Sequence, residues 1–376
     1  MVDRNRLIES FMEMVQIDSL SRREGRFAEY LRSVLNDLGM EVTEDGTAAI
    51  INGQTGNIVA HLPGELDAPV LLFCAHMDTV EPGLRVKPKV RDGVISSAGD
   101  TVLGGDDKAG IAAIVEAVRA ARTEGLRLPA VKLVFTVAEE VGLLGSKNLD
   151  YHLVGRADMG FVLDGDGAPG KIIVRAPSQD RLVATVHGRA AHAGVNPEQG
   201  INAIQVAAKA VAGLPLGRID EETTANIGVI RGGQAINIVP DKVVLEGETR
   251  SLDDRKRAAL TARLTRLMEE SVHGTGAEIT IEVEHLYSSF RLDESHPVVR
   301  AAVKAAEAAG LQPVLEQSGG GSDANMLNAA GIPTVNLAIG MEKVHTTEEY
   351  LRIKDLMDSC RLVYSILKLA SEGDLG

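Results

Sequence analysis

Residues 70–79 read Val-Leu-Leu-Phe-Cys-Ala-His-Met-Asp-Thr, an apolar run that ends in polar side chains. Four consecutive apolar residues, Val70 to Phe73, are typical of a strand that is covered on both faces of a sheet. His76 and Asp78 follow where this strand reaches the surface. Because side chains two apart in a strand face the same way, the Asp78 carboxylate can orient the His76 imidazole. This pattern predicts a metal ligand with its supporting acid; the alternative is a solvated strand end.

Two further apolar strands also end in acids. Val131–Val137 leads to Glu139 and Glu140, and Phe161–Leu163 leads to Asp164. Helical patterns alternate with these strands, which predicts an α/β fold with a mainly parallel central sheet and helices on both faces. The carboxyl ends of parallel strands meet at one edge, where ligands bind.

The alternation of buried apolar strands with helices stops after about Ser178 and resumes at about Ser288. The segment between them reads as strand, helix, strand, strand, helix and strand, which is a complete small α+β sheet of βαββαβ order. We therefore expect a discontinuous domain of residues 1–178 and 288–376, interrupted by an inserted domain of residues 179–287. The first of these would carry the chemistry.

Two outer elements are predicted from weaker patterns. A strand is expected within Lys89–Ile95, and a final helix is expected from Thr347 to about Ala370. Apolar residues at helical spacing along that last segment predict that it docks on the sheet.

Composition excludes several classes of partner. The net charge is −14, aromatic residues make up 3% of the chain and Trp is absent, so we expect no nucleic-acid partner. No apolar run approaches the length of a membrane span, and the first residues lack a signal-peptide core, so we expect no membrane association. Only Cys74 and Cys360 are cysteines, which favours a reducing, cytoplasmic location.

The candidate chemistry rests on a set of acids and imidazoles that lie at strand ends or beside glycine: His76, Asp78, Asp106, Glu139, Glu140, Asp164 and His345. Two imidazoles and several carboxylates suit two zinc-like ions with a bridging carboxylate. Taken singly, Asp106 and Asp107 could be helix caps, and the other acids and His345 could be solvated surface groups. Acids after three separate buried strands favour the metal site.

Several stretches resemble the signature blocks of the co-catalytic zinc metallopeptidases. They are CAHMDTV (74–80), GGDDKAGIAAI (104–114), VAEEVGLLGSK (137–147), VLDGDG (162–167), GRAAHAG (188–194) and VHTTEEY (344–350). That family includes carboxypeptidase G, succinyl-diaminopimelate desuccinylase and the aminotripeptidase peptidase T. The second and fourth blocks look most similar to the peptidase T branch.

This resemblance implies a role for each member of the set. His76 and Asp164 would hold one zinc ion, Glu140 and His345 would hold the other, and Asp106 would bridge the two. Asp78 would orient His76, and Asp107 would be a helix cap or a support. Glu139 would be the general base, taking a proton from a metal-bridging water and passing it to the leaving amine.

The resemblance also implies that the inserted domain is a lid or dimerisation domain, which predicts a homodimer. In that domain His192 would stabilise the oxyanion, Asn237 would contact substrate and Arg250 would pair with a terminal carboxylate. Gly320 and Ser322 would belong to a substrate-binding loop at 318–322. His192 could instead be a turn histidine, Arg250 could form a salt bridge within the lid, and the loop could be simply mobile.

Together these features predict a two-zinc aminopeptidase that hydrolyses the N-terminal bond of short peptides, tripeptides included. Co²⁺ or Mn²⁺ could replace Zn²⁺. The same site could serve a dipeptidase or an N-acyl amino acid deacylase, because substrate choice depends on lid contacts. A protein of another class, which binds metal but has lost catalysis, is disfavoured by the intact Glu139 and ligand set.

Overall fold

The structure is a computed structural model that describes residues 2–375, and the chain divides into two compact units. The larger unit contains the chain up to Arg175, Arg291–Ser318 and the segment from Ser322 onward. The smaller unit contains Ala176–Phe290 and Gly319–Gly321. The boundaries expected from the sequence, at 178/179 and 287/288, each lie three residues from this division.

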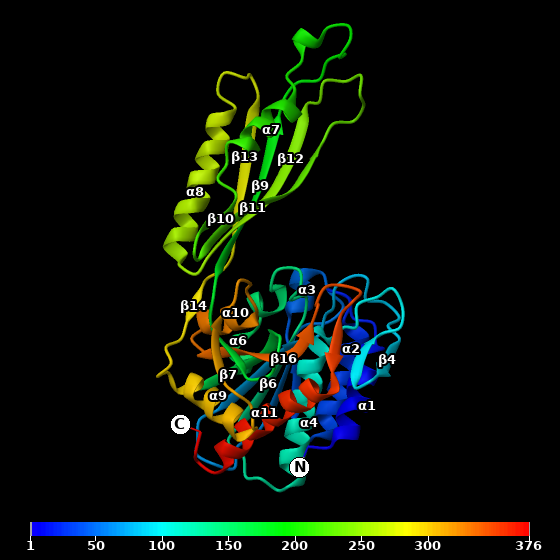
Figure 1. The fold of residues 1–376 in the computed structure, drawn as a ribbon, viewed down its shortest axis with the longest axis vertical. Helices are drawn as coiled ribbons and strands as arrows, with labels where there is room; N and C mark the ends of the chain where they lie inside the picture. The colour runs from blue at the N-terminus through cyan, green and yellow to red at the C-terminus, as the bar shows by residue number, and fades with distance from the viewer. Residues whose placement is uncertain (1, 376) are drawn as a thin grey trace. The chain divides into compact units, whose positions relative to one another are not determined.

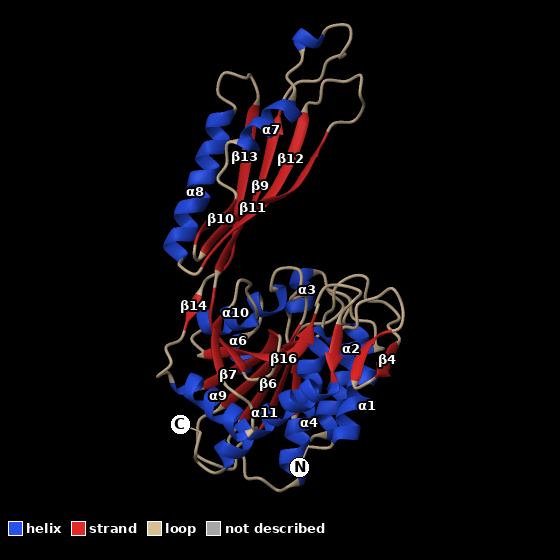
Figure 2. Ribbon diagram, viewed as in Figure 1, coloured by secondary structure: helices blue, strands red, loops and turns tan. Residues whose placement is uncertain are grey.

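A mixed sheet forms the centre of the larger unit (Figures 1 and 2). Its strands are β1 (Glu41–Glu44), β2 (Ile58–Leu62), β3 (Leu71–His76), β4 (Pro88–Arg91), β5 (Val94–Ser97), β6 (Val131–Thr136), β7 (Met159–Asp166), β8 (Lys171–Ala176), β14 (Phe290–Arg291), β15 (Val314–Gln317), β16 (Thr334–Glu342) and β17 (Tyr350–Arg352). The four central strands, in the order β6-β3-β7-β16, are parallel. Antiparallel strands extend the sheet at both edges. The predicted α/β fold with a mainly parallel centre is confirmed.

The parallel centre brings three strand ends to one edge. In the register His76 lies opposite Thr136, and β7 runs beside β3 in the same direction. All six residues of β3 and all six of β6 are buried, as their apolar runs predict. His76, the residues after Thr136 and Asp164 therefore emerge together at the carboxyl edge of the sheet.

Helices cover both faces of this sheet (Figure 1). They are α1 (Arg4–Val15), α2 (Gly25–Asp37), α3 (Thr47–Ile51), α4 (Gly105–Thr123), α5 (Leu144–Lys147), α6 (Tyr151–Val154), α9 (Pro297–Ala308), α10 (Asp323–Ala329) and α11 (Ile353–Ser371). Helices α1, α4, α9 and α11 pack in one hydrophobic core with Phe73 of β3. Cys74, which points to the opposite face, lies against Asp323 of α10.

Two of the weaker predictions need correction. The segment Lys89–Ile95 is a hairpin of β4 and β5, because Asp92 and Gly93 adopt the positive φ angles of a tight turn. The last helix begins at Ile353 and not at Thr347. Residues 350–352 form β17, which pairs with β16 and β5, and apolar spacing within one segment does not reveal such partners.

The smaller unit is an antiparallel sheet with two helices (Figure 2). Its elements are β9 (Ser178–His187), η1 (Pro197–Gln199), α7 (Ala203–Ala212), β10 (Gly217–Asp220), β11 (Thr223–Gly232), β12 (Lys242–Ser251), α8 (Asp254–Ser271) and β13 (Glu278–Tyr287). The strand order is β10-β11-β12-β9-β13, and both helices contact β9 and β12. The longer elements follow the predicted βαββαβ order, with β10 as a short additional strand.

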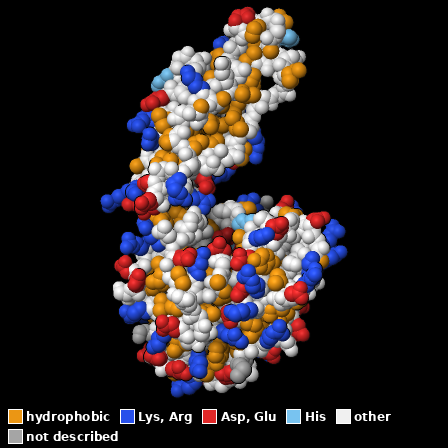
Figure 3. Space-filling view, in the orientation of Figure 1, with side chains coloured by type: hydrophobic (Ala, Val, Ile, Leu, Met, Phe, Trp, Pro, Cys, Tyr) orange, Lys and Arg blue, Asp and Glu red, His pale blue; other side chains and the backbone are white. Residues whose placement is uncertain are grey.

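The surface of the larger unit mixes charges of both signs with hydrophobic side chains on the face seen in Figure 3. Single exposed apolar residues of this kind are normal for a globular protein. Among residues 2–375, no helix combines the length and the apolar character that crossing a bilayer requires.

Candidate active site

The His76 imidazole is fixed at the end of β3. It is 1% exposed, and its Nδ1 atom lies 2.9 Å from the Asp78 carbonyl oxygen and 3.4 Å from the Asp78 carboxylate. These contacts hold the ring by one nitrogen. The other nitrogen, Nε2, is thereby aimed at the acids that follow the neighbouring strands.

Asp106 lies between the two predicted imidazoles. Its Oδ1 atom is 2.9 Å from His76 Nε2, and its Oδ2 atom is 3.2 Å from His345 Nε2. His345 comes from the loop after β16, more than 200 residues further along the chain. One carboxylate thus faces a different imidazole with each of its oxygens.

Each imidazole also faces a second acid. Asp164 Oδ1 lies 3.7 Å from His76 Nε2, and Glu140 Oε2 lies 3.0 Å from His345 Nε2. The five predicted metal ligands therefore form two groups of three that share Asp106. The structure brings together every residue that the sequence proposed for metal binding.

Glu349 holds the start of α4, where Asp106 lies. It is 2% exposed, and its carboxylate accepts hydrogen bonds from the amides of Leu103 (2.7 Å), Gly104 (2.9 Å) and Asp106 (3.1 Å). Sequence reasoning missed this residue. The available signal was its place in the VHTTEEY block, four residues after His345.

Asp107 supports the site and does not cap α4. Its Oδ2 atom accepts the His76 amide at 3.1 Å, whereas the capping position of that helix is Gly104, and the Glu349 carboxylate accepts the Gly104 and Asp106 amides there. Of the two roles that the sequence left open, cap or support, the contacts fit the support. Its other oxygen, Oδ1, is buried without a hydrogen-bond partner among residues 2–375.

Asp78 serves the two glutamates as well as His76. Its carboxylate accepts the amide of Glu139 at 2.9 Å and the amide of Glu140 at 3.3 Å, and it accepts the Ser21 hydroxyl at 2.7 Å. One buried acid therefore fixes His76 at the end of β3 and the two glutamates that follow β6. No sequence pattern pointed to Ser21.

Burial raises the pKa of most acids in this cluster. It raises the pKa of Asp164 to about 7, and it raises the pKa of Glu139 well above its usual range, with the Asp164 charge adding to the effect. The pKa of Glu140 is raised for the same reason. Carboxylates that crowd together in this way cannot neutralise one another's charge. A group of acids with shifted pKa values is typical of a functional site.

Asp106 behaves in the opposite way. Burial alone would raise its pKa, but hydrogen bonds with His345 and His76 outweigh burial and lower it. Hydrogen bonds with Asp106 and Glu140 raise the pKa of His345 to about 10. The two imidazoles are thus shared among Asp106, Asp164 and Glu140, for which they are the nearest groups that can carry positive charge.

The donor set fits divalent cations. Ligand atoms of His76, Asp106 and Glu140 all lie within 4.8 Å of one another, as do those of His76, Asp107 and Asp164. Glu140 Oε1 is buried without a partner, like Asp107 Oδ1. Imidazole and carboxylate suit zinc and related metals, and unsatisfied buried oxygens are expected where a cation belongs.

The predicted substrate residues of the smaller unit lie mostly on its surface. His192 and Asn237 are exposed and belong to adjacent turns, because the Ala193 amide donates to the Asn237 carbonyl at 2.9 Å. Arg250 instead makes a two-pronged ion pair with Glu248, at 2.9 and 3.0 Å, and lies 3.4 Å from the Gly319 carbonyl. That ion pair corresponds to the salt-bridge alternative for Arg250.

The two predicted loop residues lie in different units, since Gly320 belongs to the smaller one and Ser322 to the larger one. Ser322 is 5% exposed and caps α10, where its hydroxyl accepts the Ala324 amide. The same hydroxyl accepts Asn336 Nδ2, and Asn336 in turn accepts the Asp164 amide. Ser322 is therefore connected to the ligand cluster through one side chain.

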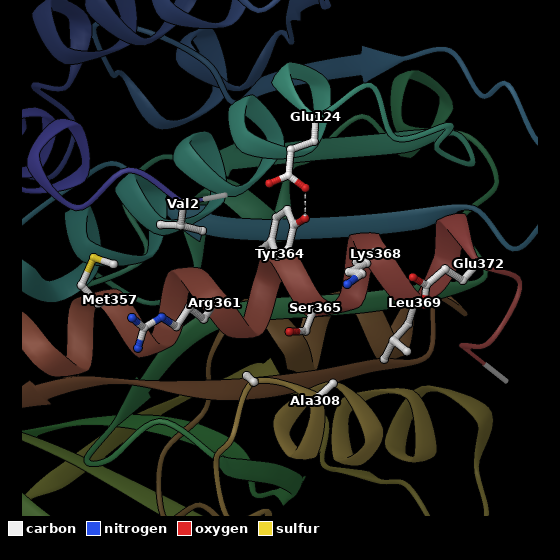
Figure 4. A pocket seen from close by; sticks show the side chains of 11 residues that line it. Val2, Glu124, Ala308, Met357, Arg361, Tyr364, Ser365, Lys368, Leu369 and Glu372 are labelled. Atoms are coloured by element: carbon white, nitrogen blue, oxygen red, sulfur yellow. Dashed lines mark hydrogen bonds between the residues drawn. The ribbon is translucent and has the colours of Figure 1, made fainter.

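A cavity of about 540 Å³ lies elsewhere on the larger unit, where α11 packs near α4 and α9 (Figure 4). Its polar groups include Tyr364, whose hydroxyl donates to the Glu124 carboxylate at 2.5 Å. None of its lining residues carries a buried polar atom that lacks a partner within residues 2–375. It therefore lacks the chemistry of the acid cluster.

Comparison with known proteins agrees with this geometry. The model of one family, described as Peptidase family M20/M25/M40, matches residues 72–369. The chain belongs to this family. The resemblance to the metallopeptidases is confirmed, and so is the prediction of an enzyme that hydrolyses peptide bonds.

Three relatives of this M20-family chain match it along almost its whole length. The uncharacterized protein YqjE of Bacillus subtilis (strain 168) is 43% identical over 372 residues, which cover 99% of this chain and 100% of that protein. Aminopeptidase PepT of Bacillus cereus is 43% identical, with a TM-score of 0.89 and coverage of 98% and 99%. A tripeptidase of Staphylococcus aureus is 38% identical, with a TM-score of 0.94 and coverage of 99% and 100%. These matches support the peptidase T-like branch of the family.

Proposed function

We propose that this chain is a two-metal aminopeptidase that releases the N-terminal residue of short peptides, tripeptides included. The observation that carries the proposal is the position of Asp106, whose two oxygens face His76 and His345 at 2.9 and 3.2 Å. A carboxylate shared by two imidazole groups is the arrangement that a bridging ligand needs. The names of the two similar structures, an aminopeptidase and a tripeptidase, support the choice of substrate.

His76, Asp106 and Asp164 would hold one metal ion, and His345, Asp106 and Glu140 would hold the other. Zn²⁺ is the expected metal because the ligands are imidazoles and carboxylates; Co²⁺ and Mn²⁺ accept the same set. When bound, such ions lower the pKa of a water molecule and polarise the carbonyl group of the substrate.

Glu139 would act as the general base. Its amide is fixed by Asp78, and its neighbour Glu140 faces His345 at 3.0 Å. Adjacent residues that leave a strand point in different directions, which would leave Glu139 for the substrate side. A carboxylate there can take the proton of the attacking water and deliver it to the leaving amine.

His192, Asn237, Arg250 and the loop with Gly320 and Ser322 would bind the substrate. Support for Arg250 comes from its guanidinium, which has the planar shape that a terminal carboxylate matches. In this structure a peptide carboxylate would have to compete with Glu248 for it. Ser322 would contribute indirectly, through Asn336 and Asp164.

Homodimer formation through the smaller unit and a cytoplasmic location belong to the same proposal. The smaller unit exposes Ile236 fully and Val195 at 76%, which supports an apolar contact there. Cys74 and Cys360 are buried free thiols, which fits a reducing compartment.

The test is a substrate panel with added zinc. Tripeptides, dipeptides and N-acetylated amino acids are incubated with the purified protein, and released N-terminal residues or acetate are quantified. The proposal expects tripeptides to be cleaved with the highest kcat/KM. Hydrolysis of dipeptides or acetylated amino acids without tripeptide cleavage would instead identify a dipeptidase or a deacylase on the same site.

A further inference from the structure

Glu24 is a buried acid outside the ligand set that contacts the turn carrying Glu139. It is 0% exposed and stands directly before α2, the usual place of a helix cap. Its side chain makes no capping hydrogen bond to that helix. Instead its Oε1 atom accepts the Arg22 amide at 2.8 Å and the Ala138 amide at 3.0 Å, across 114 residues of chain.

Ala138 needs such a contact because of its backbone conformation. Its φ angle is +50°, in the left-handed region that residues with a Cβ atom adopt only at an energetic cost. It is also fully buried, so its amide cannot be satisfied by water. The conformation therefore persists only if the surrounding contacts hold it.

Four consecutive amides at this point are held by side chains and by no strand partner. Asn57 accepts the Val137 amide at 3.1 Å, Glu24 accepts the Ala138 amide, and Asp78 accepts the next two. We name residues 137–140 the glutamate turn. Its last two residues are the proposed base and a proposed metal ligand.

We propose that Glu24 is a positioning residue, which holds Ala138 in its left-handed conformation and so aims the side chain of Glu139. The inference rests on the proposed function. If the Ala138 amide were released, the residue would relax towards the ordinary region of φ, and the following side chains would rotate with the backbone. Displacements of about 1 Å in a reacting group can reduce the rate about 10²-fold.

The opposing interpretation is that Glu24 only stabilises the start of α2. Its contact with Arg22, at φ +69° in the preceding loop, is consistent with that role. A purely structural acid would lower the stability of the protein when removed and would leave kcat unchanged. The two interpretations therefore differ in kinetics, and they differ again when the strain at Ala138 is relieved.

The experiment compares Glu24→Ala, Glu24→Gln, Ala138→Gly and the double variant Glu24→Ala/Ala138→Gly, each zinc-loaded and assayed on a tripeptide. Glu24→Ala should lower kcat about 10- to 100-fold, with KM within about twofold and metal content equal to wild type. Glu24→Gln keeps an acceptor oxygen and should stay within about threefold. Because Gly adopts φ +50° without strain, the loss from Glu24→Ala should shrink to about fivefold or less in the Ala138→Gly background.

Glu116→Ala is the matched control. Glu116 is also a buried acid (3% exposed), but it lies in α4, away from the glutamate turn, and pairs with Arg6 of α1. The substitution should lower stability and leave kcat unchanged. If Glu24→Ala does not fold, Glu24→Asp keeps a buried carboxyl group, draws it back by one methylene and should lower kcat in the same manner.

An unchanged kcat in a folded Glu24→Ala or Glu24→Asp variant overturns the inference, and so does an equal loss in both backgrounds at position 138. Failure of the wild-type protein to cleave any tripeptide would count against the proposed function instead. In that case the same variants are compared on whichever peptide or acyl substrate the wild type hydrolyses.

Discussion

Asp180 in the smaller unit is buried and Asp164 in the larger unit is largely buried, yet their surroundings affect them in opposite ways. Asp180 accepts the Thr261 hydroxyl at 2.7 Å, lies 3.0 Å from His285 Nδ1 and forms an ion pair with Arg257. Burial alone would raise its pKa, but these hydrogen bonds outweigh burial and lower it. Among the basic side chains of residues 2–375, His76 is the one that pairs with Asp164, at 3.7 Å, and burial raises the pKa of Asp164 to about 7.

The difference separates a structural acid from one that is proposed to bind metal. A buried carboxylate with a hydroxyl and a guanidinium around it is stable as an anion and holds the fold together. The acids of the ligand cluster lie against one another, and Asp107 Oδ1 and Glu140 Oε1 have no hydrogen-bond partner among residues 2–375. Such a cluster destabilises the protein by itself, and cations offset that cost.

The largest expected effect is on turnover. Glu139→Ala should lower kcat by about 10²- to 10⁴-fold, because the proposed base is lost, while the bound metal remains near two ions per chain. The measurement is steady-state kinetics beside metal analysis of the same sample. Activity close to wild type would remove Glu139 from the role of base.

Asp180→Asn should destabilise the protein by about 3 kcal/mol, because Arg257 would stay buried without its counter-charge. Urea unfolding of the metal-free protein measures the change. Glu246→Gln in the same sheet is the control, since Glu246 pairs with Arg181 and Arg231 near the surface and its loss should change stability far less than the loss of Asp180. Equal effects of the two substitutions would show that Asp180 is no special structural acid.

Asp164→Asn should change the free energy of unfolding in the opposite direction. It should stabilise the metal-free protein by about 2 kcal/mol at pH 8. The folded-state pKa of Asp164, about 7, lies above the unfolded value of about 3.9, so its charge lowers stability progressively as the pH rises between them. The gain should vanish near pH 4. Asp180, with its lowered pKa, contributes stability that is complete above about pH 4 and is lost as the pH falls through its folded-state value.

Unfolding curves of both variants at pH 4, 6 and 8 test these signs. A stability difference for Asp164→Asn that does not change with pH would contradict the electrostatic account of the cluster. For Asp180→Asn, by contrast, an equal stability difference at pH 8 and pH 6 is expected, because the lowered pKa of Asp180 keeps it ionised over that range.

The sequence predicted the parts of this site that local pattern can carry. His76, Asp164 and the Glu139–Glu140 pair each follow a buried strand, and the parallel order of the strands then brings them together. The α/β fold follows from the same runs. The roles given to these residues remain predictions, which the experiments above address.

The contacts that support the ligands could not be predicted in this way. Glu24 holds the Ala138 amide and Glu349 holds the Asp106 amide, over separations of 114 and 243 residues. Nothing in the neighbouring sequence of either glutamate marks the distant amide that it accepts. The predicted start of the last helix was wrong for a related reason, since Leu351 pairs with Met341 and Ile95 in the sheet.

Counting the metal ions tests the central claim most directly. Metal-free protein is equilibrated with Zn²⁺, excess metal is removed by dialysis, and the bound ions per chain are determined for the wild type and for Asp106→Ala. The account predicts two ions in the wild type and loss of tight binding at both positions in the variant, because both groups share Asp106. Fewer than two ions in the wild type, or an unchanged count in the variant, would contradict it.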